Sequence, residues 1–342
     1  MKAAMTQQGA VRLHDVPKPA VEPRHVLVET VYSAISTGTE LLVLRSMSEQ
    51  PHALGYSAAG IVRELGPGVE GLEPGQLVAC YGGPYVRHAE WLSVPRNLVA
   101  PVGPNASAEA AAFGGLGAIA IHALRQAKLQ FGETAIVVGL GILGQLIAQI
   151  ATAAAYDVIG FDLSEERCRL LRARGAEACA SVEDLQRLLG SRAVKADAVL
   201  VCAGGKQGGL IDQALDWLHD RGTVVIVGDV AATCSREKMF AKEANLVISR
   251  AGGPGRYDAG YEREGVDYPV GYVRWTEGRN LREFIRLLER RAIDVAQLIT
   301  DRYRFASIAD AYASLQQPAA KPLGVLLDYT DTGTAGDAAQ AG

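Results

Sequence analysis

The chain has 342 residues, of which 49% are hydrophobic and 21% charged, and its formal net charge is −4 at pH 7. A length above about 250–300 residues favours two domains over a single hydrophobic core. No basic stripe points to nucleic acid or an anionic membrane, and no apolar run is long enough to serve as a membrane span or a signal peptide. The five cysteines include no CxxC pair, so neither a disulfide framework nor a thiolate zinc site is indicated. We therefore expect a cytoplasmic α/β protein.

The chain as far as residue 125 is rich in short β-type runs broken by Gly and Pro. Runs such as HVLVETVYSAIS (25–36), AAGIVREL (58–65) and AEWLSVP (89–95) alternate with turns such as GPGVEGLEPG (66–75). This pattern predicts a compact, mostly β domain over residues 1–125.

From about residue 130, apolar strands alternate with helical segments, beginning with TAIVVGL (134–140), LGQLIAQIATAAA (143–155) and YDVIGFD (156–162). Strands that are apolar on both faces predict a doubly wound parallel sheet covered by helices, which we place at residues 126–265. A C-terminal segment follows at 266–330, with an amphipathic helix at 281–291 and a last strand. Residues 331–342 have the composition of a disordered tail.

The segment VVGLGILGQL places Gly139, Gly141 and Gly144 in G-x-G-x-x-G spacing between a strand and a helix. In a dinucleotide site, the first glycine permits the tight turn and the second lets the pyrophosphate approach the backbone. The third lets helix and strand pack closely, and the helix N-terminus attracts the phosphates. The alternative is a tight turn with only a structural role.

Asp162 ends the next apolar strand, where a carboxylate accepts hydrogen bonds from the adenosine ribose. Since a carboxylate repels a 2′-phosphate, we predict NAD(H) rather than NADP(H), with a flavin as the less favoured alternative. Arg167 would weaken this preference, but we expect it on the solvated helix face. The predicted cofactor contacts are Gly139, Leu140, Gly141, Ile142, Leu143, Gly144, Asp162, Cys202, Ala203 and Gly228, with core packing as the alternative for Cys202.

These features, together with PGVEGLEPGQLV (67–78) and GPYVRHAEWLSVPRNLVAPV (83–102), resemble the medium-chain dehydrogenase/reductase superfamily, the zinc alcohol dehydrogenase-like fold. The resemblance extends to about residue 330. It implies a GroES-like catalytic domain before a Rossmann domain that binds NAD, and a C-terminal segment that returns to the catalytic domain.

Zinc-dependent members of this superfamily bind the metal through a Cys, the His of a GHE motif and a third Cys or Glu, and this chain departs from the pattern at each place. Ser36 or Thr37 stands where the Cys would be, Tyr56 replaces the His, and Gly115 stands at the third position. These residue types do not supply the three ligands that a catalytic zinc ion needs. We therefore expect a zinc-independent branch with no metal site, similar to polysaccharide-biosynthesis oxidoreductases.

Without zinc, another group must hold the substrate oxygen and move its proton. Tyr56 is the first candidate, because a phenol can donate to a carbonyl or accept a proton; filling space is its alternative role. Thr39 matches a hydroxyl that, in zinc-containing relatives, passes the substrate proton towards the nicotinamide ribose. Glu40 is the third catalytic candidate, either as the base or as a residue that orients this loop.

Residues 250–280 gather arginines and aromatic side chains, a combination that suits sugars, carboxylates or phosphates. A dimer contact or a domain hinge is the alternative. The resemblance to polysaccharide-biosynthesis enzymes also implies a sugar- or cyclitol-like substrate. The predicted substrate contacts are Tyr85, His88, Arg250, Tyr272, Arg274 and Trp275.

The sequence therefore predicts an NAD(H)-dependent oxidoreductase that transfers hydride between nicotinamide and a secondary alcohol or ketone. Two alternatives stay open: a quinone or enone reductase, which needs no metal, and a nucleotide-binding protein without activity. The resemblance further implies a homodimer that pairs along the strand near NLVISR (245–250).

Overall fold

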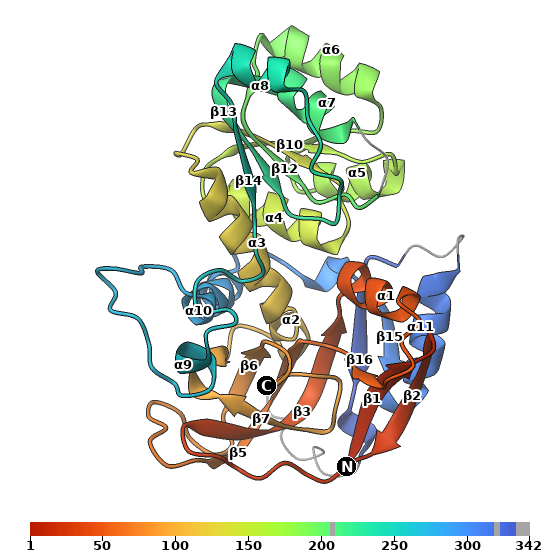
Figure 1. The fold of residues 1–342 in the computed structure, drawn as a ribbon, viewed down its shortest axis with the longest axis vertical. Coiled ribbons are helices and arrows are strands. Elements are labelled where there is room, and N and C mark those ends of the chain that lie inside the picture. Colours follow the sequence, from red (N-terminus) through yellow and green to blue (C-terminus); the bar gives the residue numbers. More distant parts are fainter. Residues whose placement is uncertain (206–208, 318–321, 333–342) are drawn as a thin grey trace. The chain divides into compact units, whose positions relative to one another are not determined.

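The computed structural model describes residues 1–205, 209–317 and 322–332 and divides the chain into two compact units (Figure 1). Unit 1 comprises Met1–Ala118 and Gly252–Gly342, and unit 2 comprises Ile119–Ala251. Unit 1 is mostly β and unit 2 contains a doubly wound parallel sheet, so the predicted fold class is confirmed. Most of the predicted tail at 331–342 lies outside the described residues.

Unit 1 is built on a seven-stranded mixed sheet and a three-stranded antiparallel sheet. The large sheet has the order β15-β16-β3-β5-β6-β8, with β7 paired to β3. Its strands are β3 (His25–Ile35), β5 (Ser57–Leu65), β6 (Leu77–Tyr81), β7 (Trp91–Pro95), β8 (Val99–Pro101), β15 (Ile299–Arg304) and β16 (Gly324–Asp328). The small sheet joins β1 (Lys2–Gln7), β2 (Ala10–Asp15) and β4 (His52–Ala53).

Two apolar clusters pack on strands of unit 1. Val28, Val62 and Val78, from β3, β5 and β6, belong to one cluster. Ile35 at the end of β3 belongs to the other, together with Val325 of β16, which pairs with it in antiparallel register. The last strand of the chain therefore completes a sheet that begins near the N-terminus.

The helices of unit 1 range from single turns to the 13 residues of α10. They are α1 (Thr37–Arg45), α2 (Ala108–Ala111), α9 (Ala259–Glu262), α10 (Glu277–Glu289) and α11 (Ile308–Gln316), with 3₁₀ turns η1 (Arg96–Leu98), η2 (Ala296–Leu298), η3 (Phe305–Ser307) and η4 (Thr330–Thr332). Helix α10 starts earlier than the predicted 281 because the Thr276 side chain accepts a hydrogen bond from Arg279 N and caps it. Helix α3 (Gly114–Ala127) carries the chain from unit 1 into unit 2.

The segment after Ala251 belongs to unit 1, whereas the sequence pattern predicts a nucleotide-binding domain that extends to residue 265. Gly252 N donates to the Tyr81 hydroxyl at 2.9 Å, and Arg256 Nη2 donates to the Gly83 carbonyl oxygen at 2.8 Å. These long-range hydrogen bonds fix the segment to the loop after β6. Sequence periodicity does not reveal such contacts.

Unit 2 is a six-stranded parallel sheet with the order β11-β10-β9-β12-β13-β14. Its strands are β9 (Thr134–Val138), β10 (Asp157–Phe161), β11 (Glu177–Cys179), β12 (Ala196–Val201), β13 (Leu218–Ile226) and β14 (Asn245–Ile248); its helices are α4 (Ile142–Ala153), α5 (Glu165–Arg172), α6 (Val182–Arg192), α7 (Leu210–Trp217) and α8 (Arg236–Lys242). The chain winds outward from β9 to β11 and then returns to β12 beside β9. Ligands of such sheets bind at the carboxyl ends of the strands where the winding reverses.

One helix of unit 2 is shorter than its sequence pattern. The segment 210–222 has a helical pattern, but α7 ends at Trp217 and Leu218 is already extended. Leu218 pairs with Ala196 of β12, so strand pairing overrides the local helical period. Within the described residues, no helix combines the length and apolar character that a membrane span requires.

Candidate nucleotide and active sites

Each glycine of the G-x-G-x-x-G loop occupies its position for a different structural reason. Gly139 has φ +88°, and a Cβ there would lie 2.6 Å from Ala203 N. A Cβ on Gly144 would lie 1.9 Å from the Gly139 carbonyl oxygen, so only glycine allows this packing. A Cβ on Gly141 would meet nothing within 4 Å, and Gly141 is the N-cap of α4. The loop therefore borders open space at a helix N-terminus, which fits a pyrophosphate.

Asp162 follows β10 and binds the same loop. Its Oδ2 accepts from Leu140 N at 2.7 Å and its Oδ1 accepts from Ser164 N at 2.8 Å. Each carboxylate oxygen has two lone pairs, so capacity remains for ribose hydroxyls. Arg167 was expected on the solvated helix face, but its Nη1 lies 3.4 Å from Asp162 Oδ2 and its side chain is only 27% exposed. Attraction between opposite charges explains the difference.

The ends of β12 and β13 close against the glycine loop. Cys202 N and Ala203 N both donate to the Val138 carbonyl oxygen, at 2.7 and 3.0 Å, and a Cβ on Gly228 would lie 2.4 Å from Ala203 O. Burial raises the pKa of Cys202 to about 12, so this thiol stays protonated. The predicted cofactor residues thus gather at the carboxyl edge of one sheet.

Tyr56 and Ser36 form a hydrogen-bonded hydroxyl pair in unit 1. Tyr56 precedes β5 and Ser36 follows β3, and the Tyr56 hydroxyl donates to Ser36 Oγ at 2.6 Å. Burial raises the pKa of Tyr56 to about 12; the charge of Glu40 adds to the rise, whereas hydrogen bonding with Ser36 and Thr39 opposes it. Tyr56 is therefore a neutral phenol at physiological pH and can donate a proton.

Gly115, the third position at which zinc-dependent relatives carry a ligand, faces an aromatic ring. A Cβ on Gly115 would lie 2.7 Å from Tyr81 Cδ2, and Gly115 N donates to Ser57 Oγ at 2.8 Å. The Tyr81 ring also meets the Tyr56 ring edge-on, with centroids 6.0 Å apart. A Glu or Cys at position 115 would have to displace these groups.

The side chains at these three positions do not fit a zinc ion. A hydroxyl, a phenol and a glycine stand where Cys, His and carboxylate would be required. Across residues 1–205, 209–317 and 322–332, no three His, Cys, Asp or Glu side chains are grouped so that they could hold a metal.

Glu40 belongs to a buried polar network that adjoins the hydroxyl pair through Ser36. Its Oε1 accepts from Ser36 N at 2.7 Å, and its Oε2 accepts from His88 Nε2 at 3.0 Å and from the Tyr312 hydroxyl. His88 Nδ1 lies 2.7 Å from the hydroxyl of Ser33. Because Glu40 is only 3% exposed, this arrangement supports the orienting role rather than the role of a base. Thr39, in contrast, is exposed in the first turn of α1.

The predicted substrate residues lie in different surroundings. His88 is fully buried with both ring nitrogens engaged, so we assign it to the polar network. Tyr85 packs against an apolar cluster, with its ring centroid 6.0 Å from that of His25. Tyr272 is 90% exposed, and the Arg274 guanidinium lies 4.9 Å from the Trp275 ring centroid.

Arg250 is also exposed, and it belongs to unit 2 rather than unit 1. For the surface residues Arg250, Tyr272, Arg274 and Trp275, contact with substrate stays a prediction.

Sequence reasoning missed several residues around the hydroxyl pair. Tyr81 and Tyr312 carry no motif, and only long-range packing brings them to the site. Ser36 is one of two residues, with Thr37, that stand where zinc-dependent relatives carry the Cys, and its polar side chain at that place was the available signal. The partly buried ion pair between Arg256 and Glu262, at 2.5 Å, holds the segment after Ala251 and has no recognisable spacing in the sequence.

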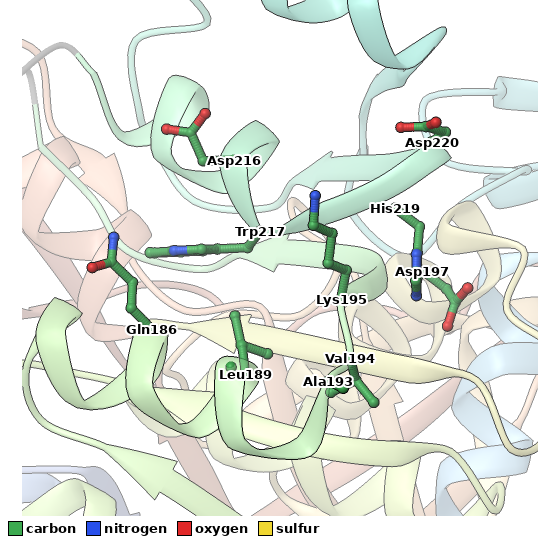
Figure 2. Close-up of a pocket in the computed structure, with 11 residues that line it drawn as sticks. Gln186, Leu189, Ala193, Val194, Lys195, Asp197, Asp216, Trp217, His219 and Asp220 are labelled. Atoms are coloured by element: carbon green, nitrogen blue, oxygen red, sulfur yellow. The ribbon is translucent and has the colours of Figure 1, made fainter.

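A separate pocket of about 940 Å³ lies in unit 2. Figure 2 shows the side chains that line it. Lys195 and Asp197 line it at the start of β12, and His219 lines it at the start of β13. These are the amino ends of parallel strands, away from the glycine loop. The pocket therefore lies away from the predicted nucleotide site.

Comparison with known proteins relates this geometry to a family. Residues 22–129 match the model of the alcohol dehydrogenase GroES-like domain, and residues 143–263 match that of the zinc-binding dehydrogenases. The chain is 24% identical to D-xylulose reductase of Saccharomyces cerevisiae over 353 residues, covering 90% of this chain and 92% of the relative. It is also 24% identical to sorbitol dehydrogenase of Pongo abelii over 260 residues, covering 64% and 72%.

Solved structures show the same fold. Galactitol-1-phosphate dehydrogenase from Escherichia coli superposes with a TM-score of 0.79 at 23% identity, covering 96% of this chain and 100% of the other. A dehydrogenase of unknown specificity from Escherichia coli gives a TM-score of 0.80 at 18% identity, covering 96% and 98%. The two family models together match most of the chain, and the relatives named above are dehydrogenases and reductases. The chain is an oxidoreductase and belongs to the medium-chain dehydrogenase/reductase family.

Proposed function

We propose that the protein is a zinc-independent, NAD(H)-dependent oxidoreductase that transfers hydride between nicotinamide and a secondary alcohol or ketone of a sugar- or cyclitol-like substrate. The hydrogen bond between Tyr56 and Ser36 is the observation that carries this proposal. It joins Tyr56, which replaces the His of zinc-dependent relatives, to Ser36, one of the two residues (with Thr37) that stand where their Cys would be. Tyr81 packs at the third position, beside Gly115. A protonated phenol supplies the proton donor that carbonyl reduction needs.

The residues of unit 2 fit the nucleotide. The glycine loop and the N-terminus of α4 would hold the pyrophosphate, and Asp162 would accept hydrogen bonds from the ribose. NAD, when bound, supplies the hydride acceptor, and NADH supplies the hydride donor. Tyr56 would hold or donate the proton at the substrate oxygen, and Thr39 would pass it on.

The names of the relatives support a polyhydroxylated substrate. They include D-xylulose reductase, sorbitol dehydrogenase and D-guloside 3-dehydrogenase of Escherichia coli, the last 28% identical over 205 residues. A probable quinone oxidoreductase of Schizosaccharomyces pombe is also 28% identical, over 226 residues. Quinone reduction is therefore the second candidate, since it requires no metal.

Nicotinamide absorbance at 340 nm tests these candidates directly. The purified protein is assayed with D-xylulose and a benzoquinone in the presence of NADH, and with sorbitol, myo-inositol and a methyl guloside in the presence of NAD⁺. Each assay is repeated after chelation, and elemental analysis measures zinc. Turnover of a polyol or ketose that survives chelation, without stoichiometric zinc, supports the proposal.

Three other outcomes would contradict the proposal. Turnover of the quinone alone would favour the second candidate. About one zinc per chain with activity lost to the chelator would reject zinc independence. NADH binding without turnover of any probe would favour a nucleotide-binding protein.

We also propose that the protein forms a homodimer through unit 2. Among the residues that the structure describes, β14 is an edge strand of the parallel sheet and pairs with β13. Ile248 at its end is 68% exposed. An exposed edge with apolar side chains favours pairing with a second copy across a two-fold axis.

A further inference from the structure

Ser36 is held against the Tyr56 hydroxyl by its backbone as well as its side chain. Ser36 N donates to Glu40 Oε1 at 2.7 Å, and Glu40 N donates to the Ser36 carbonyl oxygen at 2.9 Å. Glu40 is fixed in turn by His88 and Tyr312, which come from a loop and from α11. Ser36 is only 7% exposed. Its hydroxyl is therefore a preorganised group rather than a mobile surface side chain.

The hydrogen bond between the two hydroxyls can reverse its direction. Each hydroxyl has one donor and two acceptor lone pairs, so either oxygen can donate to the other. The 2.6 Å separation lies within the range of O–H···O bonds. When Tyr56 loses its proton, the Ser36 hydroxyl can donate to the phenolate oxygen with no movement of heavy atoms. Such charge-assisted bonds are roughly twice as strong as neutral ones.

The other groups that face Tyr56 stabilise its phenolate form less than Ser36 does. Glu40, from α1, is negative and raises the pKa of Tyr56, after the larger effect of burial. Tyr81, from β6, keeps its proton because burial raises its own pKa well above 10. Hydrogen bonds with Ser36 and Thr39 are the effects that lower the pKa of Tyr56, and that with Ser36 is the larger.

We propose that Ser36 is a further catalytic residue, which stabilises the Tyr56 phenolate while the Tyr56 proton is on the substrate. In carbonyl reduction, NADH, when bound, would supply the hydride of the new C–H bond and would leave as NAD⁺. The carbonyl oxygen takes the Tyr56 proton, and the electron pair of the broken O–H bond stays on the phenolate. Solvent then returns a proton through the exposed Thr39. The inference rests on the proposed role of Tyr56.

Fluorine NMR tests the inference without a substrate. The full chain with NAD⁺ bound is labelled with 3-fluorotyrosine, whose fluorine lowers phenol pKa values into an accessible range, and Tyr56→Phe assigns the Tyr56 resonance. Ser36→Ala should raise the pKa of Tyr56 by about 1–2 pH units, the value of one hydrogen bond to a charged group. Ser36→Thr, which keeps the hydroxyl, should restore it. An unchanged titration in Ser36→Ala would overturn the inference.

Two control variants separate this effect from general damage. Glu40→Gln keeps an acceptor for Ser36 N but removes the charge, so the pKa of Tyr56 should fall rather than rise. Tyr329→Phe removes the hydrogen bond of 2.9 Å with Ser33 at the far end of the network. It should lower stability but leave the Tyr56 titration unchanged. A rise in both controls similar to that in Ser36→Ala would mean a purely structural role for Ser36.

A kinetic double-mutant cycle gives an independent answer with D-xylulose and NADH as probes. Ser36→Ala alone should lower kcat by about 10–100-fold. In the Tyr56→Phe background, Ser36→Ala should have no further effect, because Ser36 acts only through the phenol. Equal effects of Ser36→Ala in both backgrounds would reject the inference. If Tyr56→Phe keeps full turnover, the proposed role of Tyr56 fails instead.

Discussion

The Tyr56 phenol lies against Ser36 and Tyr81. Burial raises its pKa to about 12, so the phenol is protonated at physiological pH. We expect Tyr56→Phe to preserve the fold and NADH affinity, because Phe fills nearly the same volume. It should lower kcat by roughly 10²–10⁴-fold, the usual contribution of a positioned acid. Thr39→Val should lower kcat to a similar degree if the proton leaves through Thr39. Steady-state kinetics of the purified variants provides the measurement, and unchanged kcat in Tyr56→Phe would assign the phenol to packing.

Asp162 combines a structural and a recognition role, so its substitution must separate the two. Asp162→Asn keeps an acceptor oxygen for Leu140 N but removes the charge that repels a 2′-phosphate. We expect wild type to bind NADH more tightly than NADPH, and Asp162→Asn to narrow this difference by about 1–2 kcal/mol. Arg167→Ala removes the cation beside Asp162 and should widen the difference in affinity between NADH and NADPH. Fluorescence titrations with both nucleotides measure these preferences; equal affinities in wild type would refute the assignment.

At the scale of an element, two of the three glycines between β9 and α4, Gly141 and Gly144, differ in what surrounds them. Gly144→Ala would place its Cβ 1.9 Å from a carbonyl oxygen, so we expect strong destabilisation of unit 2. Gly141→Ala meets open space at φ −64°, so the variant should fold with near-normal stability. The methyl group would occupy the phosphate cradle, and NADH affinity should fall at least tenfold.

Thermal unfolding and NADH titration together distinguish the two glycine variants. A Gly141→Ala protein that binds NADH normally would contradict the placement of the pyrophosphate. A Gly144→Ala protein with wild-type stability would contradict the close packing of helix and strand.

The edge strand β14 leads to a prediction about assembly. We expect light scattering to give the dimer mass at micromolar concentration. Ile248→Lys should favour the monomer, because a charged side chain at the edge opposes strand pairing. Phe131→Lys provides a control, since Phe131 is also exposed but does not lie on this edge. A monomer mass for the wild type would reject pairing through β14.

At the scale of the whole molecule, buried tyrosines determine the response to alkali. Burial raises the pKa of Tyr56 and Tyr261 to about 12, and it also raises the pKa of Tyr81, Tyr312 and Tyr329. In the unfolded chain these phenols ionise near pH 10. Their stabilisation is therefore complete below about pH 10 and is lost as the pH rises towards 12 and beyond.

Denaturant unfolding between pH 8 and 11.5 measures this loss. For each buried tyrosine, the free energy of unfolding should fall by about 1.4 kcal/mol per pH unit above pH 10. A Tyr261→Phe variant should show a shallower slope. A free energy that is independent of pH above 10 would mean that these phenols ionise in the folded state.

The sequence by itself determined the features that depend on short-range patterns. Strand–helix alternation identified the parallel sheet of unit 2, because fully buried strands must be apolar throughout. The glycine spacing and Asp162 predicted the carboxyl ends of two strands of that sheet, because a tight turn needs glycine and ribose recognition needs a carboxylate. The replacement of the three zinc ligands of zinc-dependent relatives was also visible in the sequence, because metal binding depends on which side chains are present.

Tertiary structure decided what depends on contacts between distant segments. The segment after Ala251 joins unit 1 through Tyr81 and Gly83, and Leu218 enters a strand because Ala196 pairs with it. His88, a substrate-contact candidate by sequence, is buried because Glu40 and Ser33 satisfy both ring nitrogens.

The hydroxyl pair itself is also a product of the fold. Tyr56 and Ser36 come from different strand ends, and packing of β3 against β5 brings them within 2.6 Å. The sequence shows which residue types are present, but hydrogen bonds between residues far apart in the chain form only once the strands have paired.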